Sequence, residues 1–440
     1  MMQWVMAAML VCGASVMASC ANEDDPAGRQ DGDPDVPGII LDTDIGSSAD
    51  DLFALEMLYR YHGQGRCRLL GVVVDREGED CAACADVMNT YFGHGDTPIG
   101  LVRNGIPAPA VWIDYKALPR YTLADGTPMF ARSISDYSAL PDGWQLYRRL
   151  LAAQPDHSVS ICTTGFVTAL AQLLQSEADE HSPLSGVELV RQKVKCIYIQ
   201  GGVFGNAVEP DFNFGQGITF AMDFFRLWPK DVDMVLSPGE VGDAIEYTPE
   251  QVVGDVSWTD VHPVKQVYLT CNCNTGQKMW DPLTVIQAVE GDAVFSLSQR
   301  GTVSLTPQAE TLFTPSPTGH CRYQQPGSAE WAAQILEKIR QANRGQGSVP
   351  YRELYRNDGT ASFYDLIDGQ WVEEETTYNE YFADGPLFCF RWQKPGQEGR
   401  HENWEIVSCE NGKMVNKAFL RHADGTTYTI TAHLTRVEKE

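Results

Sequence analysis

From Gly38 to about Asn343, short apolar runs of strand length alternate with longer apolar stretches of helical spacing. The strand-like runs are 68–74, 97–102, 158–162, 194–200 and 233–237. Runs without polar alternation are typical of parallel strands, whose two faces are both covered by helices. The pattern therefore predicts an α/β domain with a mostly parallel sheet and helices on both faces. In such sheets, ligands bind beyond the carboxyl ends of the strands.

After a glycine-rich linker that begins at Arg344, the pattern changes over residues 350–440. Apolar positions such as Tyr428, Ile430 and Leu434 now alternate with polar ones. The dipeptides typical of hairpin turns are Asp368-Gly369, Asn411-Gly412 and Asp424-Gly425. This segment is expected to form a small antiparallel β domain, and a lipocalin-like barrel is one form it could take.

The N-terminus shows the pattern of an export signal over residues 1–19. Its last residues, Met17-Ala18-Ser19 followed by Cys20, resemble a bacterial lipobox, which would make Cys20 a lipidated N-terminus. Residues 20–37 are rich in acids and suit a solvated tether. We expect a protein anchored by lipid in the bacterial cell envelope. Simple secretion is kept as the alternative, because the signal lacks the basic residue that normally lies close to Met1.

The composition of the chain bears on the size of its core, on its partners and on its cysteines. The 440 residues are 43% hydrophobic and can form a large core in more than one domain. The formal net charge of −26 argues against nucleic acid as a partner, because the phosphate backbone would be repelled. The cysteines lie mostly in apolar surroundings, which favours buried thiols over a disulfide framework.

The most distinctive stretch follows the first strand-like run, at 38–41. Asp42 and Asp44 end that run, and Asp50 and Asp51 open a helix after a Gly/Ser turn. Acids at a helix start can simply be capping residues. Carboxylates this close repel one another unless they are protonated or share a cation, and oxygen ligands suit Ca²⁺ or Mg²⁺. An Asp-x-Asp nucleophile at a strand end is a further alternative.

Asp42-Thr43-Asp44-x-Gly46 followed by Asp50-Asp51-x-x-Ala-Leu resembles the signature of the nucleoside hydrolases, which are inosine-uridine-preferring, calcium-dependent enzymes. The resemblance covers 38–343. Here three residues, 47–49, separate Gly46 from the aspartate pair, where the usual motif has one. Further matches are Thr164-Gly165, Gly201-Gly202, the segment 209–213 and Asp281.

The resemblance implies roles for these positions. The implied ligands of Ca²⁺ are Asp44, Asp51, the carbonyl of Thr164 and Asp281, and Asp44 would also take the proton of the attacking water. The implied contacts of the ribose hydroxyls are Asp50, Asn206, Asp211 and Asn213. Trp280 would offer its face to the base.

Several positions depart from the family pattern. Ala169 replaces a usual asparagine, Asp211 replaces glutamate, and Trp280 stands where many members have histidine. The expected activity is calcium-dependent hydrolysis of the N-glycosidic bond of a small-molecule ribonucleoside. The alternatives are a tethered calcium-dependent receptor for a nucleoside or sugar without turnover, and a glycosidase for another riboside. A homo-oligomeric state is left open.

Overall fold

The computed structural model describes residues 4–13, 36–106, 113–205, 209–257, 259–271, 273, 276–344, 349–355, 360–367, 370–373, 379–384, 387–392, 400–410, 413–421 and 427–437. The chain forms two compact units. The larger is Asp25–Arg344, and the smaller combines Met1–Asp24 with Gly345–Glu440.

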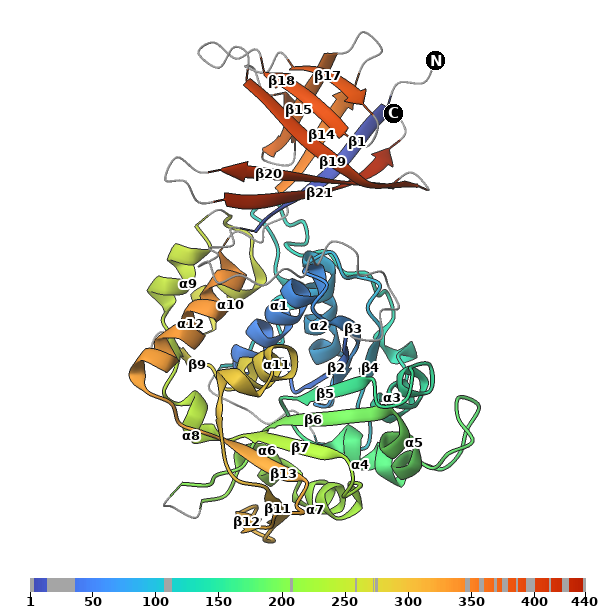
Figure 1. Ribbon diagram of the computed structural model, residues 1–440, viewed down its shortest axis with the longest axis vertical. Coiled ribbons are helices and arrows are strands. Elements are labelled where there is room, and N and C mark those ends of the chain that lie inside the picture. Colours follow the sequence, from blue (N-terminus) through green and yellow to red (C-terminus); the bar gives the residue numbers. More distant parts are fainter. Residues whose placement is uncertain are drawn as a thin grey trace. The chain divides into compact units, whose positions relative to one another are not determined.

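The larger unit is built on a mixed sheet with a parallel centre (Figure 1). The parallel strands, in spatial order, are β4 (Ile99–Leu101), β3 (Arg68–Val74), β2 (Gly38–Thr43), β5 (Val159–Thr163), β6 (Val194–Gln200), β7 (Asp233–Ser237) and β13 (Cys321–Gln325). Antiparallel strands extend it beyond β13, namely β10 (Ser296–Leu297), β11 (Gly301–Leu305) and β12 (Thr311–Pro315). The predicted mostly parallel sheet is confirmed.

Helices cover both faces of this sheet. Alternate residues of a strand point to opposite faces and belong to two different hydrophobic clusters. Ile39 and Leu41 pack on one face, and Ile40 packs on the other. The first face is covered by α1 (Asp50–Gly63), α2 (Glu79–Tyr91), α10 (Pro263–Thr270), α11 (Asp281–Glu290) and α12 (Ala329–Asn343). The second is covered by α3 (Gly143–Ala152), α4 (Thr168–Gln175), α5 (Gly186–Lys193) and α7 (Ile218–Leu227).

The remaining short elements are α6 (Phe212–Gln216), α8 (Gly239–Gly242), α9 (Pro249–Asp255) and a small sheet of β8 (Glu246–Tyr247) with β9 (Gln277–Lys278). Residues 295–305 are hairpin-like in sequence, but the two strands that they contain, β10 and β11, do not pair with each other. β10 pairs with β13, and β11 pairs with β12. The apolar pattern gave the extended conformation correctly but could not specify which strand lies opposite.

The order of the parallel strands creates a switch point. From β2 the chain moves outward through β3 and β4, then returns to β5 on the opposite side of β2 and continues to β6 and β7. The crossovers leave in opposite directions from β2 and β5, so a crevice opens beyond their carboxyl ends. Asp44 and Thr164 immediately follow these two strands, which places the signature residues at the crevice.

The smaller unit is an antiparallel sheet, as predicted. Its strand order is β14 (Val349–Tyr355), β1 (Trp4–Gly13), β21 (Thr427–Val437), β20 (Lys413–Arg421), β19 (Arg400–Glu410), β18 (Leu387–Trp392), β17 (Asn379–Asp384), β15 (Thr360–Ile367) and β16 (Gln370–Glu373). A further pairing of β14 with β15 closes the sheet on itself. Each predicted turn dipeptide lies between two strands that pair antiparallel. The lipocalin-like relationship stays a prediction.

The N-terminal predictions fall largely outside the described residues. Trp4–Gly13 forms a strand that pairs with β14 and β21. Cys20 and the acidic segment up to residue 35 lie outside the described part of the chain, so the export signal, the lipid anchor and the tether stay predictions. Among the described helices, none has the length and apolarity needed to cross a bilayer.

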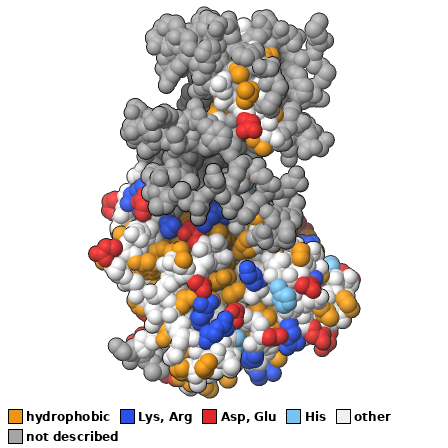
Figure 2. All heavy atoms as spheres, viewed as in Figure 1, with side chains coloured by type: hydrophobic (Ala, Val, Ile, Leu, Met, Phe, Trp, Pro, Cys, Tyr) orange, Lys and Arg blue, Asp and Glu red, His pale blue; other side chains and the backbone are white. Residues whose placement is uncertain are grey.

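Two further observations concern the described residues. The cysteines whose side chains the structure describes are free and buried, as expected for packing thiols. On the face of the larger unit seen in Figure 2, acidic and basic side chains are interspersed.

Candidate metal and substrate site

A cavity of about 270 Å³ lies beyond the carboxyl ends of β2 and β5. Its lining includes most of the residues that the sequence singled out. They are Asp44, Asp50, Asp51, Thr164, Asp211, Asn213, Trp280 and Asp281. Asn206 lies outside the described residues. The sequence reasoning missed other lining residues, among them Ser48, Gln200, Phe212 and Asp243.

Three buried aspartates meet at the floor of the cavity. Asp50 and Asp51 begin α1, and Asp281 begins α11. Each can direct one carboxylate oxygen so that these oxygens lie within 4.8 Å of one another. The amino ends of both helices face the cluster, and their dipoles stabilise the negative charge that the three carboxylates bring together.

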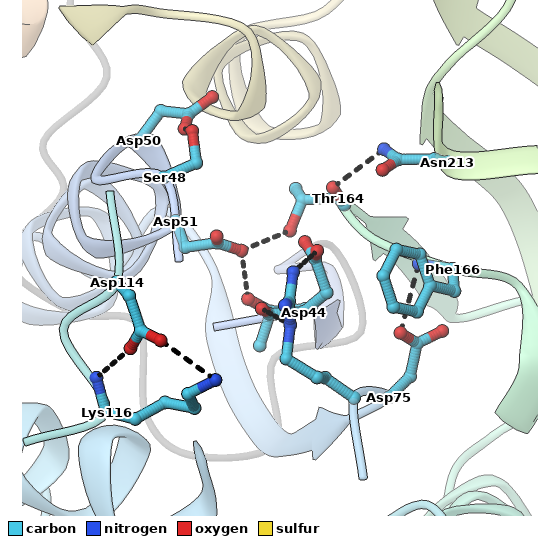
Figure 3. A network of polar contacts seen from close by, with 12 residues as sticks. Asp44, Ser48, Asp50, Asp51, Asp75, Asp114, Lys116, Thr164, Phe166 and Asn213 are labelled. Atoms are coloured by element: carbon cyan, nitrogen blue, oxygen red, sulfur yellow. Dashed lines mark hydrogen bonds and ion pairs between the residues drawn. The ribbon is translucent and has the colours of Figure 1, made fainter. Parts of the chain in front are cut away.

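Hydroxyl groups orient the carboxylate of Asp51. Its Oδ1 accepts hydrogen bonds from the hydroxyls of Thr43 and of Thr164, the latter at 3.3 Å (Figure 3). Its Oδ2 is buried and has no donor among the described residues. An oxygen in this state needs a proton or a cation, because burying it without a partner costs free energy.

The lengthened loop before α1 holds Asp50. Ser48 has a positive φ of 60° and donates its hydroxyl to Asp50 Oδ1 at 2.6 Å. The Ser48 hydroxyl in turn accepts from Gln277 Nε2 at 3.0 Å, and the backbone N–H of Asp281 donates to Asp50 Oδ2 at 3.3 Å. Residues 47–49, which lengthen the signature loop, therefore supply a hydrogen-bond donor to this aspartate.

Asp44 differs from these three aspartates because a basic residue engages it. Arg76 follows β3 and is fully buried, and its terminal nitrogen donates to Asp44 Oδ2 at 2.6 Å. Its Nε also donates to the backbone carbonyl of Asp44 at 2.9 Å. Asp44 lines the cavity but is not part of the group of three whose oxygens meet.

Two more carboxyls lie behind Asp44. Asp42 accepts from the hydroxyl of Tyr147 at 2.8 Å. Asp75 accepts from the backbone N–H of Phe166 at 3.0 Å (Figure 3). The second oxygen of each receives no hydroxyl or N–H donor among the described residues, and the two carboxyls hydrogen-bond each other, with protonated Asp75 as the donor. Burial raises the pKa of Asp42 to about 7. Asp42 is buried behind Asp44 and does not line the cavity.

Thr164 and Asn213 are joined across the cavity wall. Asn213 Nδ2 donates to the carbonyl of Thr164 at 3.2 Å and to Gln200 Oε1 at 2.6 Å. A carbonyl oxygen has two lone pairs, so that of Thr164 keeps one for a further partner. A Cβ at Gly165 would lie 2.6 Å from Asp44 Cβ, so only glycine permits this close approach of the two strand ends.

The carboxylate of Asp211 accepts hydrogen bonds from two backbone N–H groups. Its Oδ1 accepts from the N–H of Phe214 and its Oδ2 from that of Gly202, both at 2.8 Å. Asp211 therefore caps α6 and ties it to the turn after β6. Both oxygens keep free lone pairs, and burial raises the pKa of Asp211 to about 6.

The outer wall of the cavity is aromatic. Trp280 is partly buried, and its indole N–H donates to Asp243 Oδ1 at 3.0 Å. Phe212, at the start of α6, is 49% exposed and also lines the cavity. Apolar ring faces at the mouth and carboxylates at the floor give the cavity two chemically distinct ends.

The cluster of three aspartates fits a hard divalent cation. Oxygen atoms within 4.8 Å of one another lie close enough to surround one ion with only small movements of their side chains, since Ca²⁺ takes oxygen ligands at about 2.3–2.6 Å. The donor-less Asp51 Oδ2 and the purely oxygen-based donor set support this fit. The carbonyl of Thr164 belongs to the same cavity lining.

The carboxyls also predict how a cation should act on stability. Burial raises the pKa of Asp50 to about 6. Burial, followed by repulsion from neighbouring aspartates, raises the pKa of Asp51 and of Asp281. The folded protein thus keeps protons that the unfolded chain loses near pH 4. With no cation bound, these groups lower the free energy of unfolding as the pH rises from about 4 through about 6 and above.

We therefore expect Ca²⁺ to stabilise the protein more at pH 8 than at pH 5, because it takes the place of protons on these carboxyls. The measurement is the rise in melting temperature when excess Ca²⁺ replaces a chelator, at each pH. Comparing the rise at each pH removes the contribution of groups elsewhere. An equal or larger rise at pH 5 would contradict the assignment of the cluster as a cation site.

Comparisons with known proteins identify the fold of the larger unit. No protein-family model matches the chain, and no curated protein matches it in sequence. Solved structures do match. A plant nucleoside hydrolase has a TM-score of 0.52 at 15% identity, covering 70% of this chain and 99% of its own. An inosine-uridine preferring nucleoside hydrolase from Bacillus anthracis has a TM-score of 0.51 at 15% identity, covering 70% and 100%.

The type III effector protein XopQ, solved in complex with adenosine diphosphate ribose, has a TM-score of 0.50 at 17% identity, with 70% of this chain and 94% of that chain covered. The larger unit therefore has the fold of the nucleoside hydrolases. The fold that the signature motif implied is thus confirmed.

Proposed function

We propose that this protein hydrolyses the N-glycosidic bond of ribonucleosides, with Ca²⁺ as cofactor, and releases ribose and the free base. The observation that carries the proposal is the cluster of Asp50, Asp51 and Asp281 at the floor of a cavity with an aromatic mouth. The nucleoside hydrolase fold supports it. The two ends of the cavity match the two halves of a nucleoside, since ribose offers hydroxyls and the base offers an apolar face.

The ribose end is assigned to the acids and amides. A bound cation would supply Lewis-acid chemistry, by orienting sugar hydroxyls and making water easier to deprotonate. Asp51, Asp281 and the Thr164 carbonyl are assigned to the cation, and Asp50 lies where it can bind either the cation or a ribose hydroxyl. Asn213 offers its amide to a second hydroxyl, and Asp211 offers free lone pairs to another.

Asp44 is assigned to take the proton of the attacking water. Its carboxylate lines the cavity next to the cluster, and proton removal as water adds to C1′ requires a base within hydrogen-bond reach. When the bond to the base breaks, positive charge develops on the sugar. The nearby carboxylates stabilise that charge.

A second function is favoured by the pair of Arg76 and Asp44. Burial raises the pKa of the Asp44 carboxyl, and the Arg76 guanidinium opposes that rise. This opposition, together with the hydrogen bond at Oδ2, limits Asp44 as a general base but not as a ligand-binding residue. The alternative is therefore calcium-dependent binding of a nucleoside or another riboside, without turnover.

The test separates these functions. Purified protein with Ca²⁺ is given a panel of ribonucleosides and nitrophenyl riboside, and free ribose is measured together with binding heats. Hydrolysis predicts ribose release from at least one compound in proportion to enzyme. Binding heat without ribose from any compound would overturn the hydrolase proposal in favour of the receptor.

A further inference from the structure

The outer wall of the cavity carries a carboxylate to which the proposed hydrolysis gives no role. Asp243 directly follows α8, lines the cavity and is exposed to solvent. Its Oδ1 accepts from the indole N–H of Trp280 at 3.0 Å. Among the described residues, no lysine or arginine pairs with Asp243, and no donor reaches its Oδ2. One carboxylate oxygen is therefore available to a group that binds beside Trp280.

We propose that Asp243 and Trp280 select ribosides whose base carries a positive charge, of which an N-ribosylpyridinium is the simplest kind. The inference rests on the proposed hydrolysis and deepens it by naming the class of base. A cationic base is attracted by the Asp243 carboxylate and by the face of the indole ring, since aromatic faces attract cations. A neutral base gains only the stacking contact with the ring.

The charge of the cavity lining favours a cationic base. No lysine, arginine or histidine is among the described lining residues. The aspartates that line the cavity are Asp44, Asp50, Asp51, Asp211, Asp243 and Asp281. Lys278, two positions before Trp280, pairs with Glu246 at 2.6 Å. A metal ion at the floor would offset charge there, so the negative charge that a base meets on the outer wall is that of Asp243.

Local packing fixes the indole beside Asp243. A Cβ on Gly242 would lie 2.3 Å from Trp280 Cδ1, so only glycine lets the indole pack this closely against α8. The hydrogen bond to Asp243 sets the rotation of the ring. Because hydrogen-bonded groups polarise one another, the carboxylate also makes the indole more electron-rich, which strengthens its attraction for a cation. Asp243 thus acts on a bound base both by its own charge and through the ring.

The chemistry of a cationic base also fits a site that has tryptophan where a general acid would be needed. In an N-ribosylpyridinium, the C1′–N bond breaks and its electron pair moves to the ring nitrogen, so the base leaves as a neutral molecule without receiving a proton. Water adds to C1′, and its proton passes to Asp44. The products are ribose, the neutral base and a proton. The indole N–H of Trp280, which donates to Asp243, is no general acid at neutral pH, and this class of substrate requires none.

The test compares ribose release from nicotinamide riboside, whose pyridinium is cationic, from its neutral dihydro form and from inosine, with Ca²⁺ present. Wild type should prefer the cation. In Asp243→Asn the amide oxygen can still accept from Trp280, but the charge is lost. We expect kcat/KM on the cation to fall about fivefold more than kcat/KM on inosine, chiefly through KM. Added salt should weaken the wild-type preference, because Asp243 is exposed.

Asp125→Asn is the matched control. It also removes an exposed carboxylate, one that accepts from Thr127 outside the cavity lining, and it should leave the preference for the cation unchanged.

A wild type that shows no preference for the cation, or an Asp243→Asn protein that keeps the full preference, would overturn the inference. If no compound releases ribose, the proposed hydrolysis fails. The dissociation constants of nicotinamide riboside and of its dihydro form, measured by calorimetry, then decide the inference by the same comparison of wild type with Asp243→Asn. Binding of neither compound would overturn it.

Discussion

Replacing Asp51 by asparagine is expected to abolish bound calcium and to lower ribose release by about a thousandfold. The change removes one negative charge from the three-aspartate cluster and places an N–H₂ group where the donor-less Oδ2 stood. An amide donor repels a cation at that point. The amide oxygen can still accept from the hydroxyls of Thr43 and Thr164, so the fold should persist.

Stability distinguishes this outcome from simple misfolding. In a chelator, Asp51→Asn should melt no lower than wild type, because it replaces a buried carboxyl whose charged form is disfavoured. The matched control is Asp86→Asn, at a buried aspartate that accepts from Ser133, Ile134 and Tyr137 away from the cavity. This control should lose stability but keep bound calcium. Full calcium content and activity in Asp51→Asn would show that the metal site is misassigned.

Replacing Trp280 by histidine is expected to raise the rate on inosine relative to that on a nitrophenyl riboside by about a hundredfold or more. A departing purine needs a proton, whereas nitrophenolate leaves readily without one. The indole N–H of Trp280 donates to Asp243 and cannot act as a general acid at neutral pH. Wild type should therefore favour the activated riboside.

Trp280→Phe is the control for the ring itself. It keeps an aromatic face for the base and removes the hydrogen bond to Asp243, so it should change KM without a selective gain on inosine. If wild type cleaves inosine as readily as the nitrophenyl riboside, and histidine brings no relative gain, the leaving group is protonated by another residue. Trp280 would then serve for stacking alone.

Much of the fold could be predicted because it depends on local pattern. The run at 68–74 became β3 and that at 194–200 became β6 with the predicted bounds. Asp50 and Asp51 were recognised as helix-opening residues, and α1 begins at Asp50. The alternation of strands and helices also predicted that the cavity would lie at the carboxyl ends of the strands.

The rest depended on contacts between distant segments. The charged pair Asp75-Arg76 directly follows the predicted strand 68–74 and was a signal in the sequence that could have been read. The choice of Asp44 as a partner of Arg76 could not, because 32 positions separate them. Asp211 likewise reads as a sugar ligand in sequence, while in the structure both its oxygens accept from backbone N–H groups.

The central claim is tested most directly by a calcium titration. Calcium is added back to chelated protein, and the ribose released is measured at each step. A single nucleoside that wild type cleaves is used, and ribose is measured against calcium added per chain. We expect no ribose release in chelator and a rise that reaches its plateau at one calcium ion per chain in wild type. Asp51→Asn should release no ribose at any calcium concentration. Undiminished release from fully chelated protein, or equal restoration of Asp51→Asn, would contradict a catalytic calcium ion held by Asp51, Asp281 and the Thr164 carbonyl.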